Sequence, residues 1–165
     1  MKSQYTQDVE FNSGFGSLQT PIHLFTAAIL CGYDQLDVTR PFRYLDLACG
    51  NGHTLTLLAD AYPQADFVGI DINPAHIEKA NSIAERAGLT NVTFIQGDVV
   101  DLNSADYQPF DICAVSGVFS WLDQGRQKSL LSFVHDIVRK GGLFYLDYSA
   151  QPGMSQNATV YKMIQ

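Results

Sequence analysis

Two glycines and three aspartates are the residues of this sequence best suited to chemistry. Gly50 and Gly52 stand one residue apart just after a short apolar run, and Asp46 lies near the end of that run. Asp71 and Asp98 stand at the ends of the next two apolar runs. Closely spaced glycines let a backbone turn approach a ligand, and carboxylates accept strong hydrogen bonds from charged or hydroxyl donors. The pattern predicts a site for a ligand that carries hydroxyls, an amine or a positive charge.

Two kinds of ligand fit such a turn: a dinucleotide with a pyrophosphate, such as NAD, and S-adenosylmethionine, which has no phosphate. The dinucleotide fingerprint Gly-x-Gly-x-x-Gly places its third glycine where this sequence has the larger Leu55. Asp46 would repel a pyrophosphate but suits an ammonium or a sulfonium group. The methyl donor is therefore favoured, with Asp46 at its ammonium, Asp71 at its ribose and Asp98 at its adenine amine. An NAD-dependent oxidoreductase is the weaker alternative, and for each aspartate alone a plain turn or cap is the competing interpretation.

The elements that must position these residues alternate along the chain. The expected strands cover 43–47, 66–71, 92–97, 110–115 and 142–148. The expected helices run from Pro21 up to Gly32, over 53–62, from Pro74 up to Gly88 and over 123–140, the first with an apolar face of Ile22, Phe25, Ile29 and Leu30. Near-continuous apolar strands between helices are typical of a doubly wound, mostly parallel α/β sheet covered on both faces. Such sheets bind ligands at the carboxyl ends of their strands.

Composition limits the possible partners. The 165 residues predict one domain, with residues 1–40 as an arm and helix that cover the cofactor side and residues 41–165 as the binding core. A net charge of −7 argues against nucleic acid and against anionic membrane surfaces. The polar N-terminus and three scattered cysteines favour a reduced, cytoplasmic protein without a membrane span. The four histidines show no metal-ligand spacing, so no metal is expected.

Several motifs resemble the class I S-adenosylmethionine-dependent methyltransferases. They are "LDLACGNG" (45–52), "VGIDIN" (68–73), "FIQGD" (94–98) and "FDICAVSGVFSW" (110–121). The resemblance implies a Rossmann-like fold, S-adenosyl-L-methionine as cofactor and S-adenosyl-L-homocysteine as product. It also implies the cofactor contacts, which are Asp46, Ala48, Gly50, Gly52, Asp71, Ile72, Asp98, Val99 and Ser116.

Within this class the chain is most similar to bacterial methyltransferases that carry a downstream regulatory domain, a group that includes protein lysine methyltransferases. "GVFSW" (117–121) and "YSAQPG" (148–153) carry this finer resemblance, and the aromatic lead-in with Tyr5, Phe11 and Phe15 follows it loosely. The family sheet has two further strands, whereas this sequence ends shortly after the fifth. We therefore expect the chain to be the N-terminal part of a longer protein. Otherwise a partner, such as a second copy, would cover the fifth strand's free edge.

The methyl-transfer end is assigned to residues after the fourth and fifth strands. Methyl transfer is an in-line displacement that depends largely on positioning. Phe119, Trp121 and Tyr148 could contact the substrate near the donor methyl, with core packing as the alternative for the first two. Tyr148 and Ser116 are the catalytic candidates, although Ser116 could simply form the turn. Cys49 is disfavoured as a nucleophile because no histidine stands at a recognisable spacing.

Three functions stay open at this point. The favoured one is a methyltransferase domain that acts on a protein lysine amine or on a small molecule. The second is a cofactor-binding module without activity of its own, because the strands expected to complete the family's sheet are missing from this sequence. The third is the NAD-dependent oxidoreductase.

Overall fold

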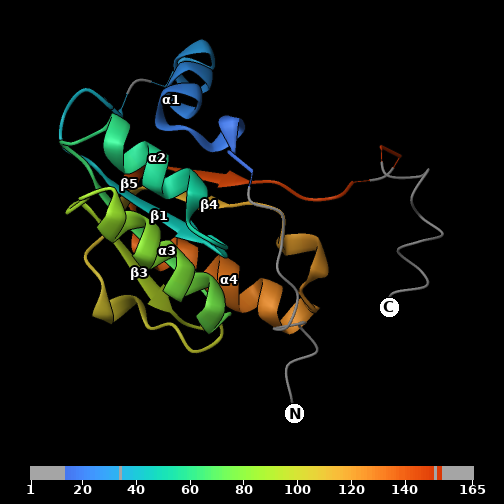
Figure 1. The fold of residues 1–165 in the computed structure, drawn as a ribbon. Helices are drawn as coiled ribbons and strands as arrows, with labels where there is room; N and C mark the ends of the chain where they lie inside the picture. Colours follow the sequence, from blue (N-terminus) through green and yellow to red (C-terminus); the bar gives the residue numbers. More distant parts are fainter. Residues whose placement is uncertain (1–13, 34, 151, 154–165) are drawn as a thin grey trace.

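Five parallel strands form one sheet in the order β3-β2-β1-β4-β5 in the computed structural model, which describes residues 14–33, 35–150 and 152–153 (Figure 1). The strands are β1 (Arg43–Leu47), β2 (Asp66–Asp71), β3 (Val92–Gln96), β4 (Phe110–Val115) and β5 (Val138–Leu146). The helices are α1 (Pro21–Leu30), α2 (His53–Ala61), α3 (Pro74–Arg86) and α4 (Gln124–Ile137), with short 3-10 turns η1 (Ser17–Gln19), η2 (Ser104–Asp106) and η3 (Phe119–Trp121). The predicted doubly wound α/β class is confirmed. The strand order reverses between β1 and β4, and ligands bind such sheets beyond the strand ends at this point.

The helices cover the two faces of the sheet unequally. Helices α1, α2 and α3 pack on one face, and α4 packs on the other (Figure 1). Successive residues of β1 point to opposite faces, so Tyr44 joins the α1–α3 side and Leu45 joins the α4 side, both without solvent exposure. The same alternation turns the carboxyl group of Asp46 toward the α1–α3 side.

Leu55 occupies the place of a dinucleotide fingerprint's third glycine without loosening the packing of α2 on the sheet. The small residue stands on the strand instead. A Cβ atom added to Gly69 of β2 would lie 2.8 Å from the Leu55 side chain and 2.7 Å from that of Phe94. The close helix–strand contact is therefore retained with the glycine on the opposite partner.

The boundary between α4 and β5 differs from the prediction. The helix ends at Ile137 rather than at residue 140, and β5 begins at Val138 and ends at Leu146 rather than covering 142–148. Gly141, with φ +83°, and Gly142 form an irregularity inside β5, where the pairing with β4 shifts register. The apolar spacing of α4 runs on through Val138, so the sequence shows no helix end before the glycines.

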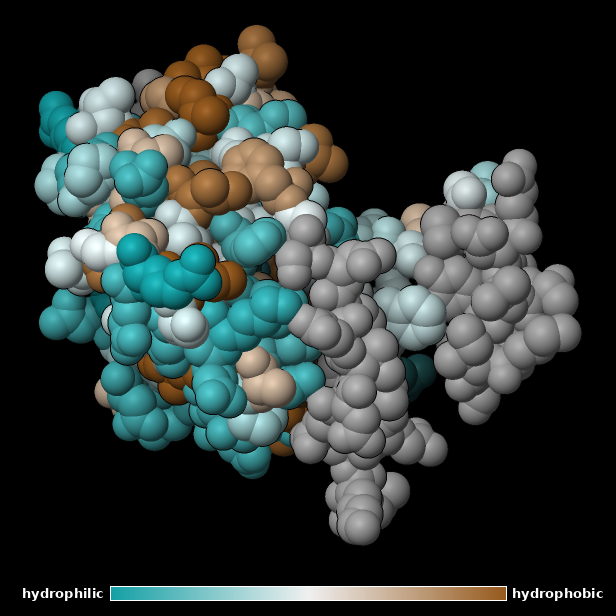
Figure 2. All heavy atoms as spheres, viewed as in Figure 1, coloured by the Kyte–Doolittle hydropathy of each residue, from teal (hydrophilic) through white to brown (hydrophobic). Residues whose placement is uncertain are grey.

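The inward face of α1 was predicted wrongly. The expected inward residues are Ile22, Phe25, Ile29 and Leu30. Only Phe25 of these packs against the core, beside Leu24, whereas Leu30 is 82% exposed. The exposed apolar side chains lie in the brown area over α1 in Figure 2. A ten-residue helix made almost wholly of apolar residues gives no periodicity that distinguishes its buried side.

Candidate cofactor site

The turn after β1 has three residues in the left-handed backbone region. They are Ala48 (φ 67°), Gly50 (φ 54°) and Gly52 (φ 68°). The backbone N–H groups of Ala48 and Cys49 both donate to the carbonyl oxygen of Ile70, at 2.7 and 3.2 Å. The turn is thereby fastened to the end of β2.

The two glycines of the turn have different surroundings. A Cβ atom at Gly52 would lie 2.6 Å from the Phe94 ring and 2.7 Å from Ala80, so this glycine is required by packing. A Cβ atom at Gly50 would meet nothing within 4 Å. Gly50 therefore borders open space that a ligand can enter, whereas Gly52 supports the turn from behind.

Ala48 is the strained member of the turn, and replacing it with glycine should stabilise the fold. A left-handed conformation costs an L-residue about 1–2 kcal/mol, part of which glycine loses again through its freer unfolded chain. We expect Ala48→Gly to raise the free energy of unfolding by about 1 kcal/mol in urea titrations. Ala27→Gly, on the exposed side of α1, is the control and should lower it by about 1 kcal/mol. An unchanged or lower stability of Ala48→Gly would contradict the strain.

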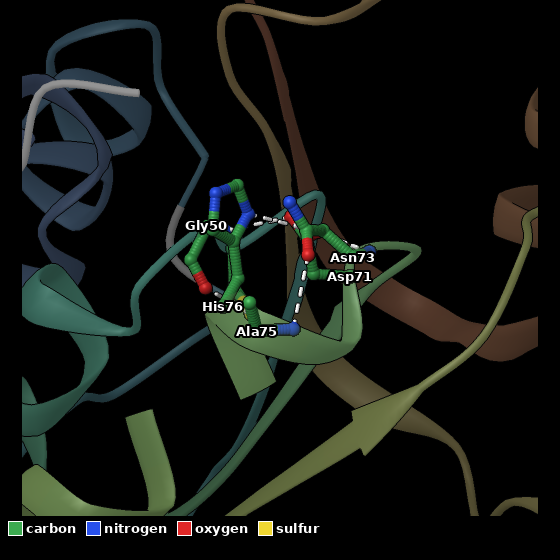
Figure 3. A network of polar contacts seen from close by, with 6 residues as sticks. Gly50, Asp71, Asn73, Ala75 and His76 are labelled. Atoms are coloured by element: carbon green, nitrogen blue, oxygen red, sulfur yellow. Dashed lines mark hydrogen bonds and ion pairs between the residues drawn. The ribbon is translucent and has the colours of Figure 1, made fainter. Parts of the chain in front are cut away.

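Asp71 is a buried carboxylate held in one orientation by several contacts (Figure 3). Its Oδ2 accepts from the Gly50 N–H at 2.9 Å, and its Oδ1 accepts from the Asn73 N–H at 2.9 Å. The His76 Nδ1 lies 3.2 Å from Oδ1. Asn73 in turn caps α3 by accepting from the Ala75 N–H at 2.9 Å. Asp71 therefore links the glycine turn to the start of α3.

Asp46 is buried at the end of β1, and burial raises the pKa of its carboxyl group to about 8. The Asp71 and Asp147 carboxylates raise this pKa further because like charges oppose ionisation. A positively charged ligand would reverse this effect. The site thus favours a cation next to Asp46.

Asp147, just beyond β5, is a site residue that the sequence reasoning missed. Its carboxylate accepts from the Ser116 hydroxyl, from the Gly117 N–H at 2.6 Å and from the Tyr145 hydroxyl at 3.4 Å. It thereby fixes Ser116, which was predicted at this end of β4. The sequence does carry a signal for Asp147, namely an aspartate at the carboxyl end of a strand. Asp71 ends β2 and Asp98 follows β3 in the same way.

Asp98 has a cationic partner that the sequence reasoning also missed. The Arg126 Nη1 lies 2.6 and 2.8 Å from the two carboxylate oxygens of Asp98. The two residues are 28 positions apart, on different elements. No local spacing in the sequence could have paired them.

The predicted carboxylates border two adjoining cavities, which share Ala48, Asp71 and Val118. The larger, of about 410 Å³, is the more polar of the two and is called the polar cavity below; it is lined by Gln19, Asp46, Gly50, His53 and Ser116 among others. The smaller, of about 60 Å³, is mostly apolar and is lined by Ile72, Val99, Leu102 and Leu122, with Asp98 and Arg126 as its charged members. Together they form a path with a polar end and an apolar end.

The N-terminal lead-in borders the polar cavity. The Gly16 N–H donates to Thr54 Oγ1 at 3.0 Å, and the Tyr44 hydroxyl donates to the Gln19 carbonyl oxygen at 2.7 Å. The Gln19 side chain is buried, and its Oε1 has no hydrogen-bond partner among the described residues. A buried acceptor of this kind suits a ligand donor. Tyr5 and Phe11 of the predicted aromatic lead-in lie outside the described residues.

The structure places the predicted site residues unevenly. Asp46, Ala48, Gly50, Asp71, Ile72, Asp98, Val99 and Ser116 line the two cavities. Gly52 lies behind the turn and lines neither. Phe119 packs against the core, and Trp121 and Tyr148 are exposed without lining either cavity. The Ser149 N–H donates to Ser120 Oγ at 2.7 Å, which ties the segment around Tyr148 to η3.

The residues that the structure describes show neither a cluster of metal ligands nor a membrane-spanning helix. No group of three possible His, Cys, Asp or Glu ligands gathers among those residues. In the same part of the chain no helix is long and apolar enough to cross a membrane.

The fold and this site define a nucleotide-cofactor-binding α/β protein of the doubly wound class. Residues 40–164 match the family described as "Methyltransferase domain", and the chain therefore belongs to that family. Its class is that of the S-adenosylmethionine-dependent methyltransferases, as the sequence predicted. The NAD alternative finds no support in these comparisons.

Solved structures agree with this assignment. PKMT2 from Rickettsia typhi in complex with AdoHcy has a TM-score of 0.86 and 26% identity, covering 93% of this chain and 29% of that one. A SAM-dependent methyltransferase from Geobacter sulfurreducens, in complex with S-adenosyl-L-homocysteine, has a TM-score of 0.54 and 28% identity, covering 76% of this chain and 47% of that one. These complexes support the predicted cofactor.

An uncharacterised protein of Synechocystis is 33% identical over 149 residues, which are 90% of this chain and 29% of that protein. A malonyl-[acyl-carrier protein] O-methyltransferase of Anoxybacillus flavithermus is 33% identical over 87 residues, which are 53% of this chain and 32% of that protein. The chain thus spans less than a third of the length of these two relatives.

Proposed function

We propose that this chain is the cofactor-binding part of a methyltransferase whose acceptor is an amine, with a protein lysine side chain as the favoured substrate. The observation that carries the cofactor assignment is the pair of cavities joined at Ala48, Asp71 and Val118. A nucleoside linked to an amino acid matches this arrangement: its aromatic ring suits the apolar cavity, its ribose the junction, and its charged end the polar cavity. When bound, S-adenosylmethionine supplies a methyl group on a positively charged sulfur.

Each carboxylate has a role in this proposal. Asp71, at the junction of the cavities, accepts from the ribose hydroxyls. Asp46 in the polar cavity accepts from the ammonium group, with Gln19 Oε1 as a second acceptor. Asp98 accepts from the adenine amine, and Ile72 and Val99 contact the ring. Because the apolar cavity holds only about 60 Å³, the ring enters it by one edge and leaves its remainder at the cavity's open side.

The acceptor end is assigned to the residues after β4 and β5. Ser116, held by Asp147, borders the polar cavity and is the candidate for orienting the acceptor. Tyr148 and Trp121 are exposed at neighbouring segments and are candidates for contacting the substrate, with Tyr148 as the second catalytic candidate. The likeness to PKMT2 supports a lysine amine. The O-methyltransferase relative supports a small-molecule or carrier-bound acceptor instead.

Two sequence-based expectations remain part of the proposal. One is a cytoplasmic location, and the other is pairing through the free edge of β5, either with another segment or with a second copy. In the described part of the chain β5 is an edge strand, because it pairs only with β4. The net charge of −7 argues against nucleic acid and so supports a protein or small-molecule substrate.

Calorimetry and turnover test the proposal separately. We expect S-adenosylhomocysteine to bind and to raise the melting temperature, whereas NAD should do neither. Transfer of a labelled methyl group to lysine-containing peptides, with methylated-amine products, is expected when the chain is active alone. Binding without turnover on peptides or small molecules would favour the module without activity. Absence of S-adenosylhomocysteine binding would overturn the cofactor assignment.

A further inference from the structure

Arg126 crosses from α4 to the end of β3 at the edge of the apolar cavity. Asp123 caps α4 and accepts from the Arg126 N–H at 3.0 Å, so the backbone of this first turn is fixed. The guanidinium then reaches Asp98, with Nη1 at 2.6 and 2.8 Å from Oδ1 and Oδ2. The side chains of Arg126 and Asp98 are 20% and 16% exposed, so the pair is largely withdrawn from water.

The contacts of Asp98 leave one carboxylate oxygen with spare capacity. Oδ1 accepts from Arg126 and also from the Val100 N–H at 3.3 Å. Among the described residues, Oδ2 accepts only from Arg126. A carboxylate oxygen has two acceptor positions, so Oδ2 can take one more donor. Because both residues line the cavity, a ligand in that cavity can provide this donor.

A purely stabilising ion pair would not explain this placement well. This pair is largely withdrawn from water and adjoins a cavity whose other walls are mostly apolar, whereas an ion pair that serves stability alone has no need of a cavity. A lone carboxylate beside such walls would turn toward water. The two contacts with Arg126 prevent this and keep the carboxylate of Asp98 pointing at the cavity.

We propose that Arg126 is a positioning residue that makes the site selective for a 6-aminopurine. It holds Asp98 so that Oδ2 accepts from the exocyclic amine. A purine with a carbonyl oxygen at that position would instead place an acceptor against the carboxylate, with no proton between them. The inference rests on the proposed function, because it requires the adenosyl end of the cofactor to occupy the apolar cavity.

The test compares two ligands that differ only at this position, S-adenosylhomocysteine and S-inosylhomocysteine, by calorimetry on the chain. We expect the wild type to bind the adenosyl compound about 100-fold more tightly. Arg126→Met should reduce this ratio about tenfold, because Asp98 loses its fixed orientation. Arg126→Lys keeps the charge with a single donor nitrogen and should give an intermediate ratio. Lys128→Met, an exposed cation on the same helix, should keep the wild-type ratio.

Two measurements distinguish selective positioning by Arg126 from a merely structural role: the ratio of the affinities for the two ligands, and the effect of Arg126→Met in a double variant. Arg126→Met should change the ratio little in an Asp98→Asn background, because Arg126 acts through Asp98. Equal loss of affinity for both ligands, with the ratio unchanged, would overturn the inference while leaving the proposed function intact. If Arg126→Met folds poorly, two other variants test the inference. A wild-type ratio of the two affinities in Arg126→Lys, together with an undiminished ratio in Asp98→Asn, would overturn the inference as well. Failure of both ligands to bind the wild type would instead overturn the proposed function.

Discussion

Asp71→Asn is expected to weaken S-adenosylhomocysteine binding about 100-fold or more. A hydrogen bond to a charged group contributes about 1.5–3 kcal/mol, and the proposed contact with the ribose involves two hydroxyls. The same carboxylate also accepts from the Gly50 N–H at 2.9 Å, so its loss loosens the turn that borders the polar cavity. An asparagine keeps the size of the side chain but turns one acceptor into a donor. Calorimetric titration measures the loss.

Asp66→Asn is the matched control for this prediction. Asp66 stands on the same strand as Asp71 but at its opposite, exposed end. It should leave the affinity for S-adenosylhomocysteine unchanged, and thermal unfolding should show both variants folded. Wild-type affinity in a folded Asp71→Asn protein would contradict the assignment of Asp71 to the cofactor.

The sequence located Asp71 and Asp46 for a simple physical reason. In a parallel sheet all strands end at the same edge, so residues that end consecutive apolar runs must lie near one another. Their positions therefore follow from counting strands, without any knowledge of side-chain contacts. The same rule applied to the fifth strand would have found Asp147, but the predicted strand extended to residue 148 and hid it.

Other features depend on packing between distant segments, which a single sequence does not encode locally. The pairing of Arg126 with Asp98 requires the position of α4 against β3. Gly69 on β2 makes room for the Leu55 side chain on α2, and this contact depends on how α2 is positioned along β2. The contact of η1, just before α1, with the sheet likewise joins distant residues, because the Tyr44 hydroxyl donates to the Gln19 carbonyl oxygen at 2.7 Å.

The charges of the site explain why it suits a cation better than a pyrophosphate. Burial raises the pKa of the Asp46 carboxyl group, and the neighbouring Asp71 and Asp147 carboxylates raise it further. Arg126, a cation that lines the smaller cavity, is already paired with Asp98. A phosphate placed beside Asp46 would oppose ionisation of its carboxyl group still further, whereas an ammonium or sulfonium group would favour the ionised form.

The stability of the free protein is expected to fall as the pH rises from about 4 to about 8, because of Asp46. Its carboxyl pKa is about 8 in the folded chain, against an ordinary pKa of 3.8 for an unperturbed aspartate. Between these values the folded state holds a proton that the unfolded state has lost, so the free energy of unfolding decreases by up to about 1.4 kcal/mol per pH unit. Below pH 3.8 the group is protonated in both states and contributes no slope. Urea titrations across this range should show the slope in the wild type and its loss in Asp46→Asn.

The affinity for the cofactor should rise with pH, whereas the free energy of unfolding should fall. The opposite signs separate the effect of Asp46 from a general effect of charge on the protein. If the ammonium of S-adenosylhomocysteine binds the ionised form of Asp46, affinity rises up to about tenfold per pH unit until about pH 8. Binding at pH 6–7 then releases close to one proton, which calorimetry in buffers of different ionisation enthalpy measures directly. Asp46→Asn should bind weakly with a flat pH profile, whereas Asp60→Asn, on the exposed side of α2, should behave as the wild type. His53 and His76 line the same cavity and are unchanged in this variant, so a pH profile that persists in Asp46→Asn would contradict the role of Asp46.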